Sequence, residues 1–263
     1  MKGVGLLRRV VRIVMCLVFS LVMYIITGLI KLITSANHSV RFKAICRATS
    51  IWGYGMAWIF GMKIKATGPR PKAPFYLVSN HVSYTDIILV CAVCPAWFIS
   101  KSEVASWPGI GALTKMGPTI FINRELRRDV KRMNQLIGQL VVDGGAVGFF
   151  PEGTTTDGTA ISPFNPSLFQ PAIEMKLPVT TAAIAYEARA GMAPVSECIA
   201  WYGDMEFAPH SANLLSQSGF TAYIRFSSET VTADDRKVLA KKSHAQVCML
   251  LDQLKGVGAG TKA

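Results

Sequence analysis

A histidine and an aspartate five residues apart are the side chains in this sequence best spaced for acid–base chemistry. The stretch Asn80-His81-Val82-Ser83-Tyr84-Thr85-Asp86 follows an apolar run, Phe75–Ser79, that is typical of a buried strand. An apolar segment, 84–94, comes next and stops at Pro95, which predicts a short helix. From one turn into that helix the Asp86 carboxylate can reach one ring nitrogen of His81 and leave the other for a substrate. Because an imidazole titrates near neutral pH, a ring held in this way can act as a general base.

A purely structural explanation of the same residues also exists. Ser83-x-x-Asp86 is a capping-box pattern, with Ser83 as the N-cap and Asp86 as the third helical residue. In that case Asp86 binds only backbone amides, and His81 is an ordinary loop histidine. Taken alone, the spacing favours this structural explanation, so other parts of the sequence must decide.

Three further blocks follow in the chain, and each places polar residues where a strand begins or ends. Taken one at a time they have structural explanations: Arg124 as a solvated residue at a helix start, Glu152 as a surface turn residue, and Pro178 as a strand opener. Their joint occurrence, in this order after His81 and Asp86, favours a catalytic function. The blocks are Gly117-Pro118-Thr119-Ile120-Phe121-Ile122-Asn123-Arg124, Phe149-Phe150-Pro151-Glu152-Gly153-Thr154 and Leu177-Pro178-Val179-Thr180.

Together the four blocks resemble the glycerolipid acyltransferase family, in particular its bacterial 1-acylglycerol-3-phosphate (lysophosphatidic acid) acyltransferases. The resemblance covers residues 78–179 and extends to the apolar N-terminal segments. It implies His81 as the catalytic base and Asp86 as the partner that orients it. The further site residues that it implies are Asn80, Arg124, Glu152, Gly153 and Thr154 as substrate-binding residues, and Pro151 and Pro178 as structural members of the site.

The resemblance also implies the co-substrate. Family members use acyl-CoA or acyl-carrier protein on the cytosolic side of a membrane, so no cofactor beyond that thioester is expected. The four histidines, His38, His81, His210 and His244, are isolated from one another in the sequence, and no metal site is predicted. The expected partners are membrane lipids, a lysophospholipid acceptor and the thioester donor, and no nucleic acid.

The expected chemistry uses the acceptor lipid itself as the nucleophile. A lipid hydroxyl attacks a thioester poorly unless a base removes its proton, and His81 would take that proton and return it to the departing thiol. Backbone amides of the turn 152–154 are candidate donors to the tetrahedral oxyanion. The sequence has no Gly-x-Ser-x-Gly elbow, which disfavours a covalent acyl-enzyme.

Two departures from the resemblance concern the acceptor head group. Close relatives of the 1-acylglycerol-3-phosphate type carry an arginine where this chain has Thr155, and a lysine near the position of Asn165. Both departures remove a cation that could bind phosphate. The first-choice acceptor is 1-acylglycerol-3-phosphate, which would give phosphatidic acid, and the main alternative is lyso-ornithine lipid or another lysophospholipid. A non-catalytic lipid-binding membrane protein is the alternative of another class.

The charge of the chain is concentrated at its N-terminal end. Of 28 Lys and Arg residues, twelve lie in residues 1–72 together with no acid, whereas residues 73–263 hold 16 basic and 16 acidic residues. These early charges flank long apolar runs, which suits an anionic membrane surface better than nucleic acid. Six scattered cysteines in mostly apolar surroundings indicate buried thiols in a reducing compartment.

Two apolar segments predict a membrane-associated appendage. Residues 13–30 carry no charge and would span about 27 Å as a helix, close to a hydrocarbon core of about 30 Å. Residues 45–62 form a second apolar run rich in aromatic residues, as is typical of a headgroup layer. We therefore expect two anchoring helices in residues 1–66, an acyltransferase domain in 67–256 and a flexible tail in 257–263. The expected location is the cytoplasmic (inner) membrane, with the active site on the cytoplasmic side.

The rest of the chain alternates between strand-like and helix-like segments. Helices are predicted at about 125–142 and from a capping box at Thr232 to about Leu254. This alternation predicts an α/β domain with a mixed, largely parallel sheet flanked by helices. The predicted strands are 75–79, 97–100, 119–122, 146–150, 179–184 and 220–226.

Overall fold

The computed structural model describes residues 2–35, 38–106, 111, 119–123 and 126–259. Within these residues seven strands form one sheet in the order β1-β7-β6-β2-β5-β3-β4. Neighbouring strands are parallel except β6 and β7, which are antiparallel, so the predicted mixed, largely parallel sheet is confirmed. The strands are β1 (Met62–Thr67), β2 (Phe75–Ser79), β3 (Trp97–Lys101), β4 (Thr119–Ile122), β5 (Ala146–Phe149), β6 (Val179–Ala188) and β7 (Phe220–Val231).

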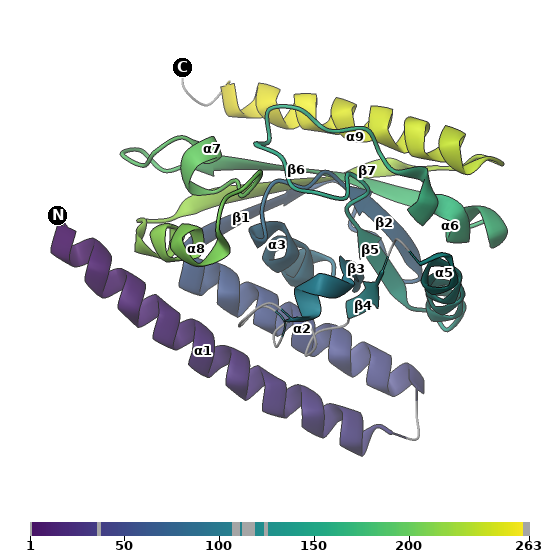
Figure 1. The fold of residues 1–263 in the computed structure, drawn as a ribbon, viewed down its shortest axis with the longest axis horizontal. Coiled ribbons are helices and arrows are strands. Elements are labelled where there is room, and N and C mark those ends of the chain that lie inside the picture. The colour runs from purple at the N-terminus through teal and green to yellow at the C-terminus, as the bar shows by residue number, and fades with distance from the viewer. Residues whose placement is uncertain (1, 36–37, 107–110, 112–118, 124–125, 260–263) are drawn as a thin grey trace.

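Helices cover both faces of the sheet (Figure 1). One face, which includes Leu77 and Ile184, packs against α2 (His38–Phe60), α3 (Thr85–Val93) and α8 (Phe207–Ser216). The other face, which includes Val78 and Ala183, packs against α5 (Arg127–Val142), α6 (Gln170–Glu174) and α9 (Arg236–Ala259). The remaining elements are α1 (Lys2–Ile33), α7 (Val195–Cys198) and the 3-10 turns Ser102–Ser106 and Pro166–Phe169.

The second N-terminal helix packs on the core of the domain over part of its length. Instead of 45–62, α2 spans His38–Phe60, and its buried residues Met56, Ala57 and Ile59 belong to the same core cluster as α3. Directly after it comes β1, a strand that the sequence analysis missed, which pairs with β7 from Met62 onward. The sheet therefore begins inside the segment that was expected to be an appendage. The period-2 pattern of Met62–Thr67 was hidden because it directly follows a long apolar run.

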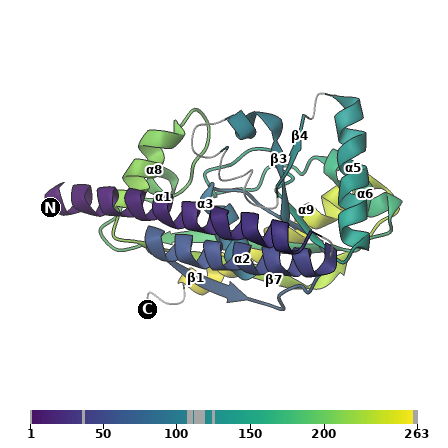
Figure 2. The same ribbon diagram turned by 90° about the horizontal axis from the view of Figure 1, so that it is seen from below.

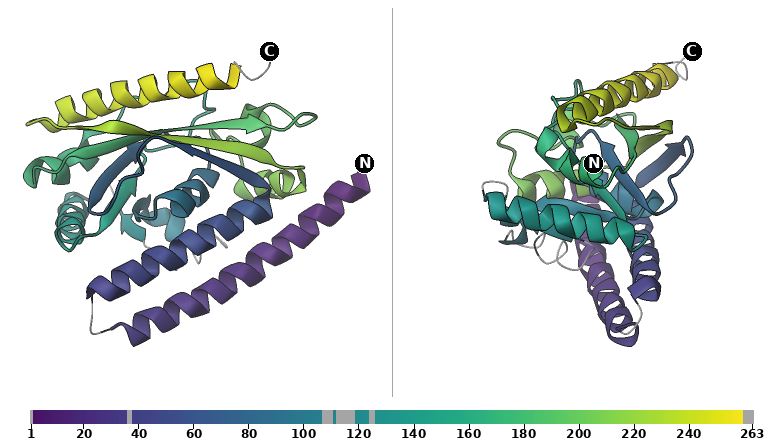
Figure 3. Two further views of the ribbon diagram at one scale, coloured as in Figure 1. Left: turned by 180° about the vertical axis from the view of Figure 1, so that it is seen from behind. Right: turned by 90° about the vertical axis from the view of Figure 1, so that its right-hand side faces the viewer.

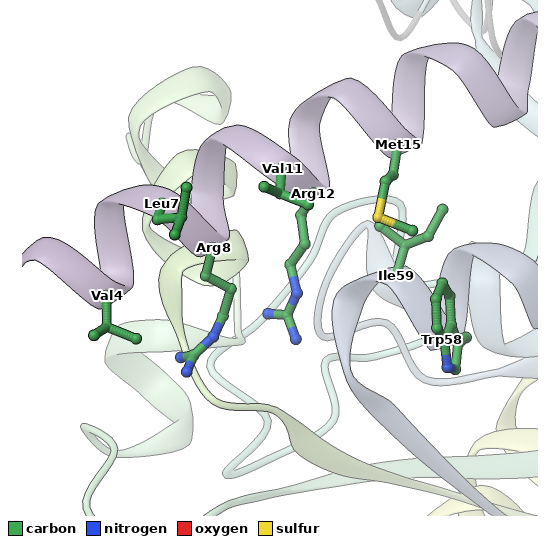
Figure 4. Close-up of a pocket in the computed structure, with 8 residues that line it drawn as sticks. All are labelled: Val4, Leu7, Arg8, Val11, Arg12, Met15, Trp58 and Ile59. Atoms are coloured by element: carbon green, nitrogen blue, oxygen red, sulfur yellow. The ribbon is translucent and has the colours of Figure 1, made fainter.

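The first helix, α1, is attached to the domain at its N-terminal half. The Nη1 atoms of Arg8 and Arg12 donate to the carbonyls of Ser216, Leu215 and Gln217 at the C-terminal end of α8, at 2.8–3.2 Å. Unpaired carbonyls at a helix C-terminus carry partial negative charge, so they favour such cations. The two arginines line a pocket of about 460 Å³ between α1 and α2, together with apolar residues such as Val11 (Figure 4).

Beyond this attachment α1 is mostly exposed. Among the described helices it alone, at Val4–Ile33, is long and apolar enough to cross a membrane, and only 11% of its most apolar window is buried. Seen from below, α1 and α2 run side by side under the sheet (Figure 2), and they project from the face opposite α9 (Figure 3).

Four other boundaries differ from those expected. The C-terminal helix α9 begins at Arg236 rather than at Thr232, because Asp235 is itself the cap and accepts from the amides of Lys237 and Val238. Strands β6 and β7 are each longer than predicted because they pair with each other over most of their length. Helix α9 reaches Ala259, so the first residues of the segment 257–263, expected to be a flexible tail, are helical.

The contact between α2 and α3 provides a test of this packing. A Cβ atom on Gly53 would lie 2.4 Å from the backbone nitrogen of Ala92 in α3, so Gly53→Ala must push the two helices apart. We expect it to destabilise the protein by about 1–3 kcal/mol in a denaturant titration. The matched control is Gly28→Ala in α1, where the added Cβ would meet nothing within 4 Å. Equal stability of the two variants would contradict the close packing of α2 on α3.

Candidate active site

The predicted site residues come together at the carboxyl edge of the parallel strands. Strands β2 and β5 are parallel neighbours, with Val78 opposite Phe149, so the chain leaves both strands at the same edge of the sheet. His81 follows β2 and Glu152 follows β5. In open α/β sheets ligands bind at this edge, outside the carboxyl ends of the strands.

The Asp86 carboxylate is the centre of a hydrogen-bond network. Its side chain has 0% exposure, and its Oδ2 accepts from His81 Nδ1 at 2.7 Å. The same oxygen accepts from the backbone amides of Val82 at 2.7 Å and Ser83 at 3.0 Å. Asp86 therefore holds the backbone of the turn and orients the histidine at the same time. The hydrogen bonds expected of a helix-start carboxylate and the contact with His81 are both present, and the catalytic role of Asp86 stays a prediction.

His81 is fixed on several sides and keeps one nitrogen free within the described residues. Its ring stacks on Phe150, with centroids 3.9 Å apart and planes 5° apart. Its backbone N–H donates to Glu152 Oε1 at 2.7 Å, and its carbonyl accepts from the amide of Thr156 at 3.0 Å. The side chain is 17% exposed, and Nε2 has no hydrogen-bond partner in the described part of the chain. An imidazole held in this way presents Nε2 to an incoming group.

Asn80 has a position that does not suit the substrate contact implied by the resemblance. The residue is 2% exposed, and its amide donates to the carbonyl of Ile184 and accepts from the N–H of Ile184, at 2.9 and 2.8 Å. It thus extends the pairing between β2 and β6 past the end of β2. The structure makes Asn80 a clamp that sets where His81 begins its turn.

Glu152 joins the two loops of the site. The resemblance places it beside the acceptor head group, but both of its oxygens accept backbone amides, from His81 and from Ser162, each at 2.7 Å. Burial is the main influence on this carboxyl group and raises its pKa above the ordinary value, against the effect of those amides. A contact between Glu152 and the acceptor stays a prediction.

The turn after Glu152 is tight and leads back over His81. Gly153 has a φ of +80°, which favours glycine, and its N–H donates to the carbonyl of Phe150 at 3.2 Å. Thr154 is exposed at the lip, and Pro151 is buried, with its carbonyl accepting from the amide of Asn165. The turn therefore brings Gly153, Thr154 and Pro151 close to His81, and their roles at the site stay predictions.

Two predicted site residues are not brought to this place by the described structure. Val179 pairs with Tyr76 near the start of β2, so Pro178 lies level with Phe75, at the opposite edge of the sheet from His81. At about 3.3 Å per residue the separation along the strand is roughly 20 Å. Pro178 therefore opens β6 and is not part of this site. Arg124 lies outside the described residues.

Sequence reasoning missed two residues that contact the pair of His81 and Asp86. Phe150 supplies the stacking surface for His81, and the Tyr186 hydroxyl donates to Asp86 Oδ1 at 2.5 Å. Ala182, Ile184 and Tyr186 are two residues apart and therefore share one face of β6. This spacing is visible in the sequence. It was overlooked because the predicted strand ended at residue 184.

The fold and the site define a class of enzyme. A histidine oriented by a buried carboxylate at the carboxyl edge of an α/β sheet suits transfer to a hydroxyl by general-base catalysis. Among the described residues no group of three or more His, Cys, Asp or Glu is placed to hold a metal ion. A family model described as Acyltransferase matches residues 63–185. The chain belongs to the glycerolipid acyltransferase family, and it is an acyltransferase.

Individual relatives are similar over different shares of the chain. A lyso-ornithine lipid O-acyltransferase from Brucella abortus is 34% identical over 209 residues, which cover 74% of this chain and 78% of that protein. A 1-acyl-sn-glycerol-3-phosphate acyltransferase from Neisseria gonorrhoeae is 36% identical over 142 residues, 53% of this chain and 56% of that protein. The crystal structure of the 1-acyl-sn-glycerophosphate (LPA) acyltransferase PlsC from Thermotoga maritima has a similar fold. Its TM-score is 0.64 at 18% identity, over 93% of this chain and 98% of that one.

The clamp role of Asn80 can be separated from substrate binding. Asn80→Ala leaves the buried N–H and carbonyl of Ile184 without their partner, so we expect a loss of roughly 2–4 kcal/mol of stability in chemical denaturation. The control is Asn213→Ala, at an exposed amide on α8, with an expected change within about 0.5 kcal/mol. Normal stability of Asn80→Ala with a raised KM for the acceptor would instead favour a substrate contact.

Proposed function

We propose that this acyltransferase moves a fatty acyl group from a thioester to the free hydroxyl of a lyso-lipid at a membrane surface. The observation that carries the proposal is the 2.7 Å hydrogen bond between His81 Nδ1 and Asp86 Oδ2, with the ring stacked flat on Phe150. This arrangement fixes the tautomer so that Nε2 is the basic nitrogen.

The reaction needs one proton carrier and one stabilised oxyanion. His81 Nε2 takes the proton of the lipid hydroxyl while its oxygen attacks the thioester carbonyl. Asp86 stabilises the imidazolium that forms, because its buried carboxylate accepts a hydrogen bond from the Nδ1–H group. When the tetrahedral intermediate collapses, the carbon–sulfur bond breaks and the imidazolium returns the proton to the thiolate. The products are the acylated lipid and a free thiol.

The turn after β5 offers donors for the oxyanion. Of the three amides in 152–154, that of Gly153 is used within the turn. The amides of Glu152 and Thr154 have no partner in the described part of the chain, and we propose them as the donors. They lie in the segment that binds His81 through Glu152, so the base and the oxyanion site are held together.

The long apolar helix α1 and the acid-free N-terminal quarter support a membrane location. We propose that the enzyme works on the cytoplasmic face of the inner membrane, where acyl-CoA or acyl-carrier protein supplies the acyl group. Either thioester brings the acyl chain to the same His81-centred site.

For the acceptor we propose lyso-ornithine lipid, with 1-acylglycerol-3-phosphate as the second candidate. The loop that crosses His81 carries Thr155 and Asp157 and no described cation, which disfavours a dianionic phosphate. On α5, Arg132 is engaged by Asp129 and by the carbonyl of Phe121. The long match to the Brucella abortus protein also supports this choice, whereas the Neisseria gonorrhoeae match and the predicted role of Arg124 support the second.

Loss of the base is the first test. His81→Ala should lower acyl transfer by on the order of 10³-fold, because general-base catalysis contributes about 10²–10⁴-fold. The measurement uses purified protein, labelled acyl-CoA or acyl-carrier protein, and a panel of lyso-ornithine lipid, 1-acylglycerol-3-phosphate and lysophosphatidylcholine. His38→Ala, at the start of α2, is the matched control and should retain activity. Turnover by His81→Ala at the wild-type rate, or no labelled lipid from the wild type, would refute the proposal.

A cation at position 155 tests whether the charge of the loop determines the acceptor. Thr155→Arg places a cation next to Thr156, whose amide donates to the carbonyl of His81. A charge-assisted hydrogen bond from such a cation to phosphate contributes about 1.5–3 kcal/mol. We therefore expect kcat/KM for 1-acylglycerol-3-phosphate, relative to lyso-ornithine lipid, to rise by about tenfold. Thr230→Arg adds the same charge at an exposed position of β7 opposite Thr180, near the start of β6, and should leave the ratio unchanged. If the ratio of the two kcat/KM values is unchanged in both variants, the lack of a cation in this loop does not determine the acceptor.

A further inference from the structure

The hydroxyl of Tyr186 contacts the catalytic carboxylate from the side opposite the histidine. We infer that Tyr186 is a positioning residue for acyl transfer, which acts through Asp86 on the base His81. The inference rests on the proposed function, and it concerns a residue that lies outside all four sequence blocks. Tyr186 Oη donates to Asp86 Oδ1 at 2.5 Å, while the bond from His81 Nδ1 goes to Oδ2.

A second hydroxyl sets the direction of this donation. Thr85 Oγ1 donates to Tyr186 Oη at 3.0 Å, so the phenol oxygen is the acceptor in that bond. The proton of the phenol is then left to point to Asp86. The chain of donors runs from Thr85 to Tyr186 to Asp86. Thr85 and Asp86 are neighbours at the start of α3, whereas Tyr186 comes from β6. The phenol thus ties the catalytic helix to the sheet.

The register of the sheet explains why residue 186 reaches this place. Ser79, the last residue of β2, lies opposite Ala182, and β6 continues to Ala188. Tyr186 is four residues beyond Ala182 on the same face, so its side chain extends over the turn that β2 has just entered. Asn80 fixes Ile184 directly below it.

Without the phenol, Oδ1 would keep no donor among the described residues. More of the negative charge of the carboxylate would then lie on Oδ2, next to His81. The carboxylate could also rotate about its Cβ–Cγ bond. Both effects change how firmly the imidazolium is held, and a proton held too firmly is returned slowly to the leaving thiol.

The phenol remains a donor throughout the working range. Burial first, and the negative charge of Asp86 second, raise the pKa of Tyr186 well above its ordinary value. The other titratable groups around the pair are Glu152 from the turn after β5, Tyr84 ahead of α3 and His210 on α8. None of these donates to Oδ1 in the described structure.

The test removes the hydroxyl and keeps the ring. Tyr186→Phe should lower kcat on the order of tenfold with KM for the acceptor within about twofold, because only part of the lost hydrogen bond to the charged carboxylate affects the transition state. The acid limb of kcat/KM against pH should move to higher pH. The matched control is Tyr223→Phe, whose hydroxyl donates to the exposed carboxylate of Glu187 at 2.6 Å, away from His81, and which should behave as wild type. A wild-type kcat with an unmoved limb in Tyr186→Phe would overturn the inference.

A spectroscopic readout separates the inference from the proposed function. The Nδ1 proton between His81 and Asp86 should give a low-field proton resonance, which we expect to move further downfield in Tyr186→Phe and to stay in place in Tyr223→Phe. A moved resonance in a protein that acylates no lyso-lipid would support the positioning role and refute the function. An unmoved resonance would refute the positioning role even in an active enzyme. Thr85→Val should produce a smaller change in the same direction, and Thr85→Ser should restore the wild-type signal, since serine keeps the hydroxyl.

Discussion

The buried carboxylate of Asp86 is the group whose requirements shape the candidate active site. An ionised group that loses water and gains no partner costs several kcal/mol, so the chain must supply donors around it. The donors come from three places: the amides of Val82 and Ser83 in the turn, the ring of His81, and Tyr186 on β6. Because two of them are backbone amides, the carboxylate fixes the path of the turn along with the ring. The same carboxylate thus holds the start of α3 and orients His81.

The turn between β2 and α3 lies beside β6, because β6 extends further than its neighbour β2. β2 ends at Ser79, whereas β6 continues to Ala188 because it pairs with β7 over that length. The free edge of β6 would leave the backbone groups of Ile184 unpaired, and the amide of Asn80 satisfies both of them. Two residues further along, the same strand delivers a phenol to the carboxylate. The antiparallel pair β6–β7, remote from the motif in sequence, therefore determines what stands beside it.

The sequence predicts features that depend on neighbouring residues better than features that depend on the register between strands. The apolar run Phe75–Ser79 was enough to predict the strand, and the spacing from His81 to Asp86 predicted the pair only together with the three later blocks. The clamp role of Asn80 and the contact of Tyr186 depend on which residue of β6 lies opposite Ser79, and alternation within one strand does not specify its partner. Pro178 was assigned to the site by the resemblance, and its place at the far edge of the sheet depends on the register of β6 against β2. The strand β1 was missed because its alternation directly follows an apolar helix.

The N-terminal helices support the catalytic turn from two directions, which gives the proposed membrane location a structural meaning. Gly53 lets α2 lie against the backbone of Ala92 in α3, and Ser50 Oγ donates to the Ala92 carbonyl at 2.8 Å. On the other side, Arg8 and Arg12 of α1 hold the end of α8. The start of α8 packs on Tyr84, next to the catalytic turn: the ring of Phe207 lies 4.9 Å from that of Tyr84, and His210 Nδ1 lies 3.1 Å from its hydroxyl. Helix α1, which supports the proposed membrane location, is therefore connected to the elements around His81 through α8, and α2 is connected to them through α3.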